Sequence, residues 1–332
     1  MRHIPVLLNE VTDALNLKPN INLVDCTLGD AGHAEAILEK TGSKGRLLGI
    51  DADAEGVLRA KRFLYRFDER AICVRENFVN LKKIVAENKF APVHGILMDL
   101  GWSSPQFEER GRGFSFLRID ELLDMRYDVA LGAFPCHPRE NGDPAASTND
   151  LDSHFRGNDR TTAANIVNEF DIDELARLFR EYGEEKLAKE IAEAIGERRK
   201  VKVFEKVGEL VELILHVYRN KLHSQNEVPW IGGIHPATKV FQALRVAVNH
   251  ELEVIRQALP QAIDIMVPGG RLAVITFHSL EDRIVKHYFQ SIDGKQARLV
   301  IKKPIIASEK EIAANPRARS AKLRVVEKIS TT

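Results

Sequence analysis

In the first hundred residues, short apolar runs rich in β-branched side chains alternate with stretches of helical spacing. Alternation at this pitch is typical of a parallel sheet covered by helices on both faces, so we expect an α/β fold. The predicted strands are 22–26, 46–50, 71–74 and 95–100, and the predicted helices between them are 34–38, 54–67 and 81–85.

After residue 100 the pattern becomes helical. Asp171 with Glu174 forms a capping-box pattern that opens a helix to about Tyr182, and amphipathic spacing continues over 186–199 and 204–220. The α/β pattern resumes with a long helix over 237–259 and an apolar strand over 271–277. We therefore expect a seven-stranded sheet domain, residues 1–108 and 233–332, interrupted by an inserted all-α domain over 109–232.

One segment of this insertion, at about 131–161, is crowded with Pro, Gly, Asn, Asp and Ser. Such a composition buries too little apolar area to offset the entropy of ordering, so the sequence predicts a disordered surface loop. Its text resembles peptides encoded by mobile palindromic repeat elements in some intracellular bacteria.

The overall charge is balanced, with 48 basic and 48 acidic residues, but the C-terminal stretch is not. From Lys295 to the end there are ten basic and three acidic residues, which predicts a local electropositive surface. The three cysteines are far apart and form no zinc or disulfide pattern, and no apolar run is long enough to span a membrane. We expect a cytoplasmic protein with no metal and no membrane association.

The strongest local feature is the turn from Asp25 to His33, with Asp51 following 22 residues after Gly29. Glycines after a first strand and an acid at the end of the second are typical of a nucleotide-like ligand whose ribose the acid binds. A tight turn that merely needs positive φ is the plainer interpretation of the glycines. Acids at Asp25 and Asp30 would repel a pyrophosphate and attract a sulfonium or ammonium, which favours S-adenosylmethionine over a nicotinamide cofactor.

Two further groups of polar residues follow predicted strands. Asp99 ends the fourth strand, and His278 and Ser279 follow the fifth, so these side chains should lie at the carboxyl edge of the sheet, where open α/β folds bind ligands. Capping of a turn by Asp99 and a structural role for His278 are the alternatives. Beside a donor pocket, we interpret all three as catalytic candidates.

Together these segments closely resemble the bacterial 16S ribosomal RNA cytosine-N4 methyltransferases, the RsmH or MraW family. The resemblance covers nearly the whole chain, although the family usually has glycine at the positions of Asp30 and Ala31. The matching segments are His3–Leu8, Asp25–Gly29, Asp99–Gly101, Ser103–Gln106, Arg112–Phe116, Leu123–Arg126, Tyr182–Glu185, His235–Thr238, Phe241–Arg245, Phe277–Arg283 and Asn315–Arg324.

The resemblance implies a class I, Rossmann-like methyltransferase sheet with a helical insertion, acting on N4 of a cytidine in the decoding region of 16S rRNA in the small ribosomal subunit. Its substrate would be recognised with the help of basic residues in the tail and in the helical domain. The implied contacts to S-adenosylmethionine are Ala31, Gly32, His33, Asp51, Phe78, Asp99 and Gln106. The expected RNA contacts are Arg198, Arg199, Lys200, Arg317, Arg319, Lys322 and Arg324.

For the reaction we expect Asp99 to accept a hydrogen bond from the attacking amine, with His278 or Ser279 as second candidates. Two other classes stay open. A nicotinamide-dependent reductase would bind NADH, and a non-catalytic RNA-binding ribosome assembly factor would keep the fold and the basic tail without transferring a methyl group. The oligomeric state, with a homodimer among the options, is also open at this stage.

Overall fold

The computed structural model describes residues 4–100, 111–127, 161–223 and 234–330. The chain divides into two compact units, one formed by residues 1–103 with 252–332 and the other by residues 104–251. The expected loop at 131–161 falls almost wholly outside the described residues. Each unit is described by itself.

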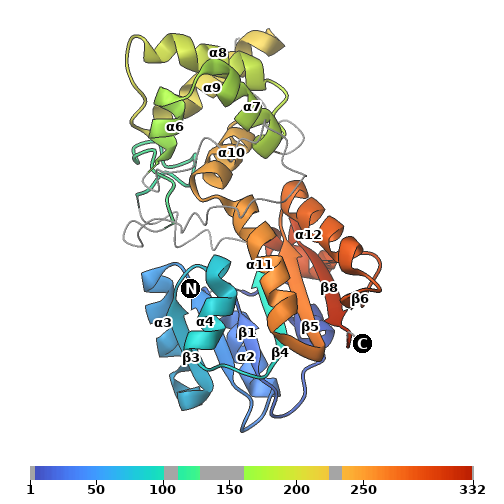
Figure 1. The fold of residues 1–332 in the computed structure, drawn as a ribbon. Coiled ribbons are helices and arrows are strands. Elements are labelled where there is room, and N and C mark those ends of the chain that lie inside the picture. The colour runs from blue at the N-terminus through green and yellow to red at the C-terminus, as the bar shows by residue number, and fades with distance from the viewer. Residues whose placement is uncertain (1–3, 101–110, 128–160, 224–233, 331–332) are drawn as a thin grey trace. The chain divides into compact units, whose positions relative to one another are not determined.

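The first unit is built on a sheet of strand order β3-β2-β1-β4-β5-β8-β6 (Figure 1). Strands β1 to β5 are parallel and β8 is antiparallel to β5, which confirms the seven-stranded path; a two-residue strand, β7, also pairs with β8. The chain reverses direction across the sheet between β1 and β4, where open α/β folds bind ligands. The strands are β1 Leu23–Asp25, β2 Leu47–Asp51, β3 Ala71–Arg75, β4 Val93–Asp99, β5 Met266–Thr276, β6 Ala297–Leu299, β7 Ile305–Ile306 and β8 Lys322–Lys328.

Helices cover both faces of this sheet because its strands are apolar on both sides. One face buries side chains of α4, α11 and α12, and the other buries side chains of α1, α2 and α3. The helices of this unit are α1 Leu8–Ala14, α2 Gly32–Lys40, α3 Ala54–Leu64, α4 Leu81–Glu87, α11 Glu251–Ile265 (whose first residue belongs to the other unit), α12 Ser279–Ile292 and α13 Glu309–Ala314, with short 3₁₀ turns η1 Tyr65–Arg70, η2 Phe78–Asn80 and η4 Pro316–Ser320.

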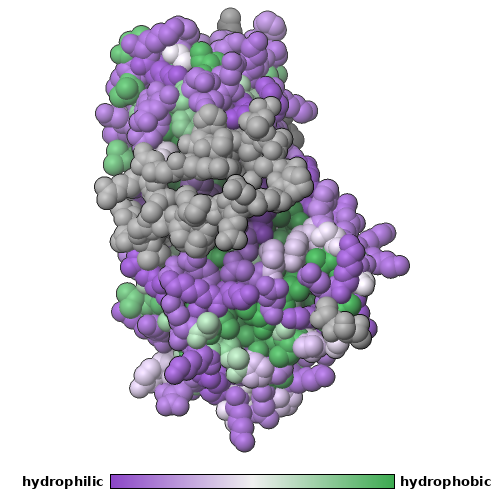
Figure 2. All heavy atoms as spheres, in the orientation of Figure 1, coloured by the Kyte–Doolittle hydropathy of each residue, from purple (hydrophilic) through white to green (hydrophobic). Residues whose placement is uncertain are grey.

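The second unit is helical in its described part. Helix α7 begins with the predicted capping box, in which the Glu174 backbone N–H donates to Asp171 at 2.7 Å and the Asp171 N–H donates back to Glu174 at 3.2 Å. Over the helices of this unit, the surface drawn in Figure 2 is mostly hydrophilic, with separate apolar spots. The helices are α6 Ala163–Glu169, α7 Ile172–Gly183, α8 Ala188–Arg199, α9 Val207–Leu222 and α10 Thr238–Val248.

The helix expected over 237–259 is interrupted. Helix α10 ends at Val248, and His250 takes a φ of 50° before α11 begins. The Asn249 amide explains the break, because it accepts from the Tyr127 N–H at 2.9 Å and donates to the Met125 carbonyl at 2.8 Å. A continuous helix was therefore the wrong prediction at this point.

Helix α10 groups with the helical unit, whereas the sequence boundary at 232/233 placed it with the sheet. Its residues close the C-terminal end of α7, since Gln242 donates to the Tyr182 carbonyl at 3.0 Å and Lys239 to the Glu184 carbonyl at 2.8 Å. These bonds supply donors to carbonyls at the end of α7 that have no donor within the helix. Among the described residues, no helix combines the length and the apolar character that crossing a bilayer requires.

Candidate donor site at the carboxyl edge of the sheet

The turn between β1 and α2 is shaped by two residues with positive φ. Gly29 has φ +49° and Ala31 has φ 60°, in the left-handed region that favours glycine. The turn places the start of α2 at Gly32. Backbone N–H groups in the first turn of a helix have no intrahelical acceptors, so they are available to a ligand here.

Gly32 is required for a reason that the sequence did not reveal. A Cβ built at this position would lie 2.3 Å from Cγ of Pro5, so the N-terminal segment packs directly on the turn. That segment is fixed from the C-terminal part of the chain, because the Asn315 side chain donates to the Ile4 carbonyl at 3.1 Å. The close approach that the sequence attributed to a ligand is made, at this glycine, by Pro5.

Asp51 ends β2 and stabilises the turn between β1 and α2 through hydrogen bonds. Its two carboxylate oxygens accept the backbone N–H groups of Gly29 at 2.7 Å and Asp53 at 2.8 Å. Burial raises the pKa of Asp51 to about 6, against the lowering effect of these two hydrogen bonds. A carboxylate oxygen has a second lone pair, so Asp51 can still accept from ribose hydroxyls.

Asp25 and Asp99 are joined by a threonine. Thr27 donates its backbone N–H at 3.0 Å and its hydroxyl at 3.3 Å to one oxygen of Asp25, and the hydroxyl accepts the backbone N–H of Asp99 at 2.8 Å. Burial raises the pKa of Asp25 to about 6, although His33 and the Thr27 N–H act in the other direction. Sequence reasoning did not single out Thr27; a hydroxyl two residues after an acid at a strand end was the available signal.

His33 lies on α2 against the same two acids. Its ring is 7% exposed, and its Nε2 is 3.6 Å from Oδ2 of Asp99. Neither ring nitrogen has a hydrogen-bond partner among the described residues. A polar ring buried in this way carries an energetic cost unless something binds it, so its place beside Asp25 and Asp99 calls for a function.

Asp30, the other acid of the turn, has a cationic partner. Nε of Arg59 donates to Asp30 at 3.0 Å, and the same guanidinium reaches Asp53 at 3.4 Å. Arg59 offsets the negative charge that the sequence assigned to this position. The acidic character of the site therefore rests on Asp25, Asp51 and Asp99.

Two expected donor contacts, Phe78 and Gln106, differ in what the structure shows of them. Phe78 opens the 3₁₀ turn η2 after β3, and its partly buried ring packs against the core. The Asn77 side chain accepts the Val79 N–H at 2.9 Å and fixes this turn. Gln106 lies outside the described residues.

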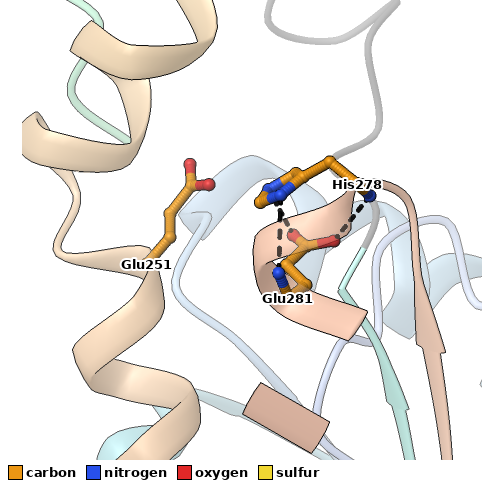
Figure 3. Close-up of side chains that lie close together, drawn as sticks. All are labelled: Glu251, His278 and Glu281. Carbon is orange, nitrogen blue, oxygen red and sulfur yellow. Dashed lines mark hydrogen bonds and ion pairs between the residues drawn. The ribbon is translucent and has the colours of Figure 1, made fainter. Parts of the chain in front are cut away.

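The catalytic candidates His278 and Ser279 mark the start of α12. Figure 3 shows the ring of His278 beside Glu281. The buried carboxylate of Glu281 accepts the backbone N–H groups of Phe277 at 2.8 Å and His278 at 3.3 Å, while Nδ1 of His278 faces the Glu281 N–H at 3.5 Å. Nε2 of His278 also lies 3.1 Å from the Glu281 carboxylate. The His278 ring is thus held in a capping box, and Ser279 is exposed.

The expected RNA contacts differ in their burial and in the groups of the chain that they bind. Arg324 and Lys322 bind Asp282, with Nε of Arg324 at 2.7 Å and Nζ of Lys322 at 3.3 Å. In the helical unit, Arg199 donates to the Val167 carbonyl at 2.9 Å, and Arg198 donates to backbone carbonyls and covers the ring of Phe204. Exposed positions are held by Lys200 and Arg319, and Arg317 is partly buried.

The residues present fit S-adenosylmethionine. Buried acids suit a sulfonium and an ammonium group, a carboxylate at the end of β2 suits a ribose, and an aromatic ring after β3 suits an adenine. A pyrophosphate would meet these same acids and be repelled. Strand order and site chemistry together define a class I methyltransferase that uses S-adenosylmethionine.

Comparison with known proteins gives the family. The model of the MraW methylase family matches residues 1–133 and 139–329, and this chain belongs to that family.

Similar proteins include the ribosomal RNA small subunit methyltransferases H of three bacteria. The Heliobacterium modesticaldum protein is 39% identical over 98% of this chain and 98% of its own length. The Clostridioides difficile protein is 38% identical over 98% and 99%, and the Carboxydothermus hydrogenoformans protein is 40% identical over 99% and 98%.

Proposed function

We propose that this chain transfers a methyl group from S-adenosylmethionine to N4 of a cytidine in the decoding region of 16S rRNA. The observation that carries the proposal is the group of acids at the carboxyl ends of β1, β2 and β4, where Asp25, Asp51 and Asp99 face the turn that opens α2. Membership in the MraW methylase family supports it. The partner is the small-subunit rRNA.

S-adenosylmethionine supplies an electrophilic methyl group when bound. Asp51 would accept hydrogen bonds from the ribose, and Phe78 would stack on the adenine. The backbone of Ala31, Gly32 and His33 would contact the donor through N–H groups at the start of α2. Gln106 completes the donor contacts that the family resemblance implies.

Asp99 is the residue that would act on the amine. As N4 forms its bond to the methyl carbon, positive charge grows on N4, and a carboxylate that accepts its N–H bond stabilises that charge. Asp99 suits this role because Thr27 fixes its backbone at the end of β4. His278 and Ser279 remain second candidates, although the capping box of α12 already engages the His278 ring.

RNA binding would depend most on the basic side chains that the structure leaves exposed. Arg319 in the C-terminal stretch and Lys200 at the end of α8 are exposed, and Arg317 lies beside Arg319. Each phosphate contact adds affinity and salt dependence. Lys200 has an ion pair with Glu197 at 2.7 Å, but both of these side chains are exposed. Arg198, Arg199, Lys322 and Arg324 are partly buried and bind groups within the chain, so we propose a smaller share for them.

Calorimetry with S-adenosylmethionine tests the donor site. Asp51→Ala should weaken donor binding at least about tenfold, because the ribose loses an acceptor and the turn at Gly29 loses its support. Asp13→Ala is the matched control, since Asp13 is an acid of the same unit whose side chain is 81% exposed. Equal binding by wild type and Asp51→Ala would refute the donor site, and NADH binding in its place would favour the reductase.

Methyl transfer to rRNA that lacks the modification tests the reaction. We expect incorporation of one methyl group at N4 of a cytidine, identified by mass spectrometry of the digested RNA. A wild-type protein that binds donor and rRNA but transfers no methyl group would favour the non-catalytic assembly factor.

A further inference from the structure

The imidazole of His33 is a buried polar group, and the proposed reaction assigns no role to it. Its ring is 7% exposed, and neither nitrogen is hydrogen-bonded within the described part of the chain. Its Nε2 lies 3.6 Å from Asp99, the carboxylate that faces the amine in the proposed reaction. Catalytic hydrogen bonds are often this long before substrates bind.

We infer that His33 is the proton outlet of Asp99: its side chain takes from Asp99 the proton that leaves N4 and holds it until the products leave. The inference rests on the proposed function. It gives His33 a side-chain role in addition to the backbone contact with the donor.

The proton count of the reaction requires such an outlet. The N4–C bond forms as the C–S bond breaks with its electron pair left on sulfur, so the positive charge passes from sulfur to N4. N4 then gives one of its two protons to the Asp99 carboxylate. A protonated Asp99 cannot accept from the next amine, so it must pass this proton on between turnovers.

Neutral imidazole is a suitable acceptor because one of its two ring nitrogens carries a free lone pair. Nε2 of His33 accepts the proton from Asp99, which becomes a carboxylate again. Because both ring nitrogens are buried, the imidazolium keeps the proton until the products leave and then releases it. A buried imidazolium needs negative neighbours. Asp99 of β4 and Asp25 of β1 supply them, and Asp51 of β2 is the next acid, acting on Asp25.

Thr27 is hydrogen-bonded to both Asp25 and Asp99. It donates to Asp25 through its N–H and its hydroxyl, and it accepts the Asp99 N–H. The Asp25 carboxylate and the Asp99 backbone are therefore held in place before any ligand arrives, and α2 places His33 beside them. A prearranged relay of this kind requires no reorganisation during the reaction.

The test is multiple-turnover methyl transfer by the full chain, with donor and unmodified rRNA in excess over the protein. His33→Gln keeps a side chain that can hydrogen-bond to Asp99 but cannot take up a proton. We expect its rate to fall at least about tenfold, with its dependence on pH flattened, while donor affinity measured by calorimetry stays within about threefold. His94→Gln is the matched control, because His94 is a partly buried histidine on β4 whose Nδ1 accepts the Asn22 N–H, and it should behave as wild type.

His33→Ala adds a second readout. Imidazole in the buffer should raise its rate in proportion to concentration, since free imidazole can replace the missing acceptor. A His33→Gln enzyme with the wild-type rate and pH profile would overturn the relay. So would a His33→Ala enzyme that binds donor and rRNA but gains nothing from imidazole, or a loss of donor affinity as large as the loss of rate. If instead the wild type fails to methylate rRNA, the proposed function itself is wrong.

Discussion

The guanidinium of Arg324 donates two hydrogen bonds to the carboxylate of Asp282, from Nε at 2.7 Å and from Nη2 at 3.1 Å. Burial alone would raise the pKa of Asp282, but the bonds from Arg324 and Lys322 outweigh it and hold that pKa below its usual value. The pair ties the first turn of α12 to β8, next to the strand that ends at the site. Arg324 is in this way a structural residue as well as a member of a basic segment.

Arg324→Ala should lower the free energy of unfolding by about 2–3 kcal/mol at pH 7, because Asp282 would keep its charge in a mostly buried place. The loss should shrink as pH falls through the lowered pKa of Asp282, since the protonated acid no longer needs the guanidinium. Urea unfolding at pH 7 and pH 3 measures both effects. Equal stability of variant and wild type at pH 7 would contradict the structural role.

Arg319→Ala should weaken rRNA binding and leave the stability of the fold nearly unchanged. Arg319 is exposed, so its removal should change the free energy of unfolding by less than about 0.5 kcal/mol. If Arg319 contacts a phosphate, rRNA affinity should fall and the slope of log K against log salt should decrease by about 1. Filter binding at several salt concentrations checks this, and an unchanged slope would remove Arg319 from the RNA interface.

Asp25→Asn should stabilise the donor-free protein at high pH. The pKa of Asp25 is about 6 when folded, against an ordinary value of 3.8, so the native state binds more protons between these values and stability falls as pH rises from about 4 to about 6. Above pH 6 the buried charge costs up to about 3 kcal/mol. Asparagine keeps an acceptor for Thr27 without that charge.

The measurement is the difference in urea unfolding between Asp25→Asn and wild type. It should favour the variant at pH 8 and vanish below about pH 3, where Asp25 is protonated in both states. Donor affinity should move the other way and weaken, because the sulfonium and ammonium lose an attractive charge. A variant that is less stable at pH 8 would show that the Asp25 charge is satisfied in the folded chain.

The sequence was sufficient for the sheet and for the acids at its edge. Apolar β-branched runs specify buried strands, and the acids Asp25, Asp51 and Asp99 follow directly after such runs, so their common edge follows from parallel pairing. The capping box at Asp171 was also predictable, because its two partners are three residues apart. Local patterns of this kind are visible in a single sequence.

Contacts between distant segments were not predictable. Arg324 and Asp282 are 42 residues apart, and no periodicity pairs them, so the basic segment was interpreted as solvent-facing. Within the run from Phe277 to Arg283, Glu281 and Asp282 cap and anchor α12, a role that the sequence analysis did not predict. A His three residues before a Glu at a helix start was the available signal for the cap.

Gly32 and Pro5 offer a test of one such distant contact. Gly32→Ala should lower the free energy of unfolding by about 1–3 kcal/mol, because the new Cβ would lie 2.3 Å from Cγ and 3.1 Å from Cδ of Pro5. Pro5→Ala removes both of those atoms. The double variant should therefore recover most of the loss, with a coupling energy above about 0.5 kcal/mol.

The control pairs Pro5→Ala with Gly269→Ala, since a Cβ at Gly269 meets nothing within 4 Å and its cost arises from its φ of +81° alone. That pair should be additive in urea unfolding. Donor binding by calorimetry should follow the same cycle, because the N-terminal segment packs on the turn that contacts the donor. Additivity of Gly32→Ala with Pro5→Ala would mean that the glycine is needed for the ligand after all, as its place in the turn first suggested.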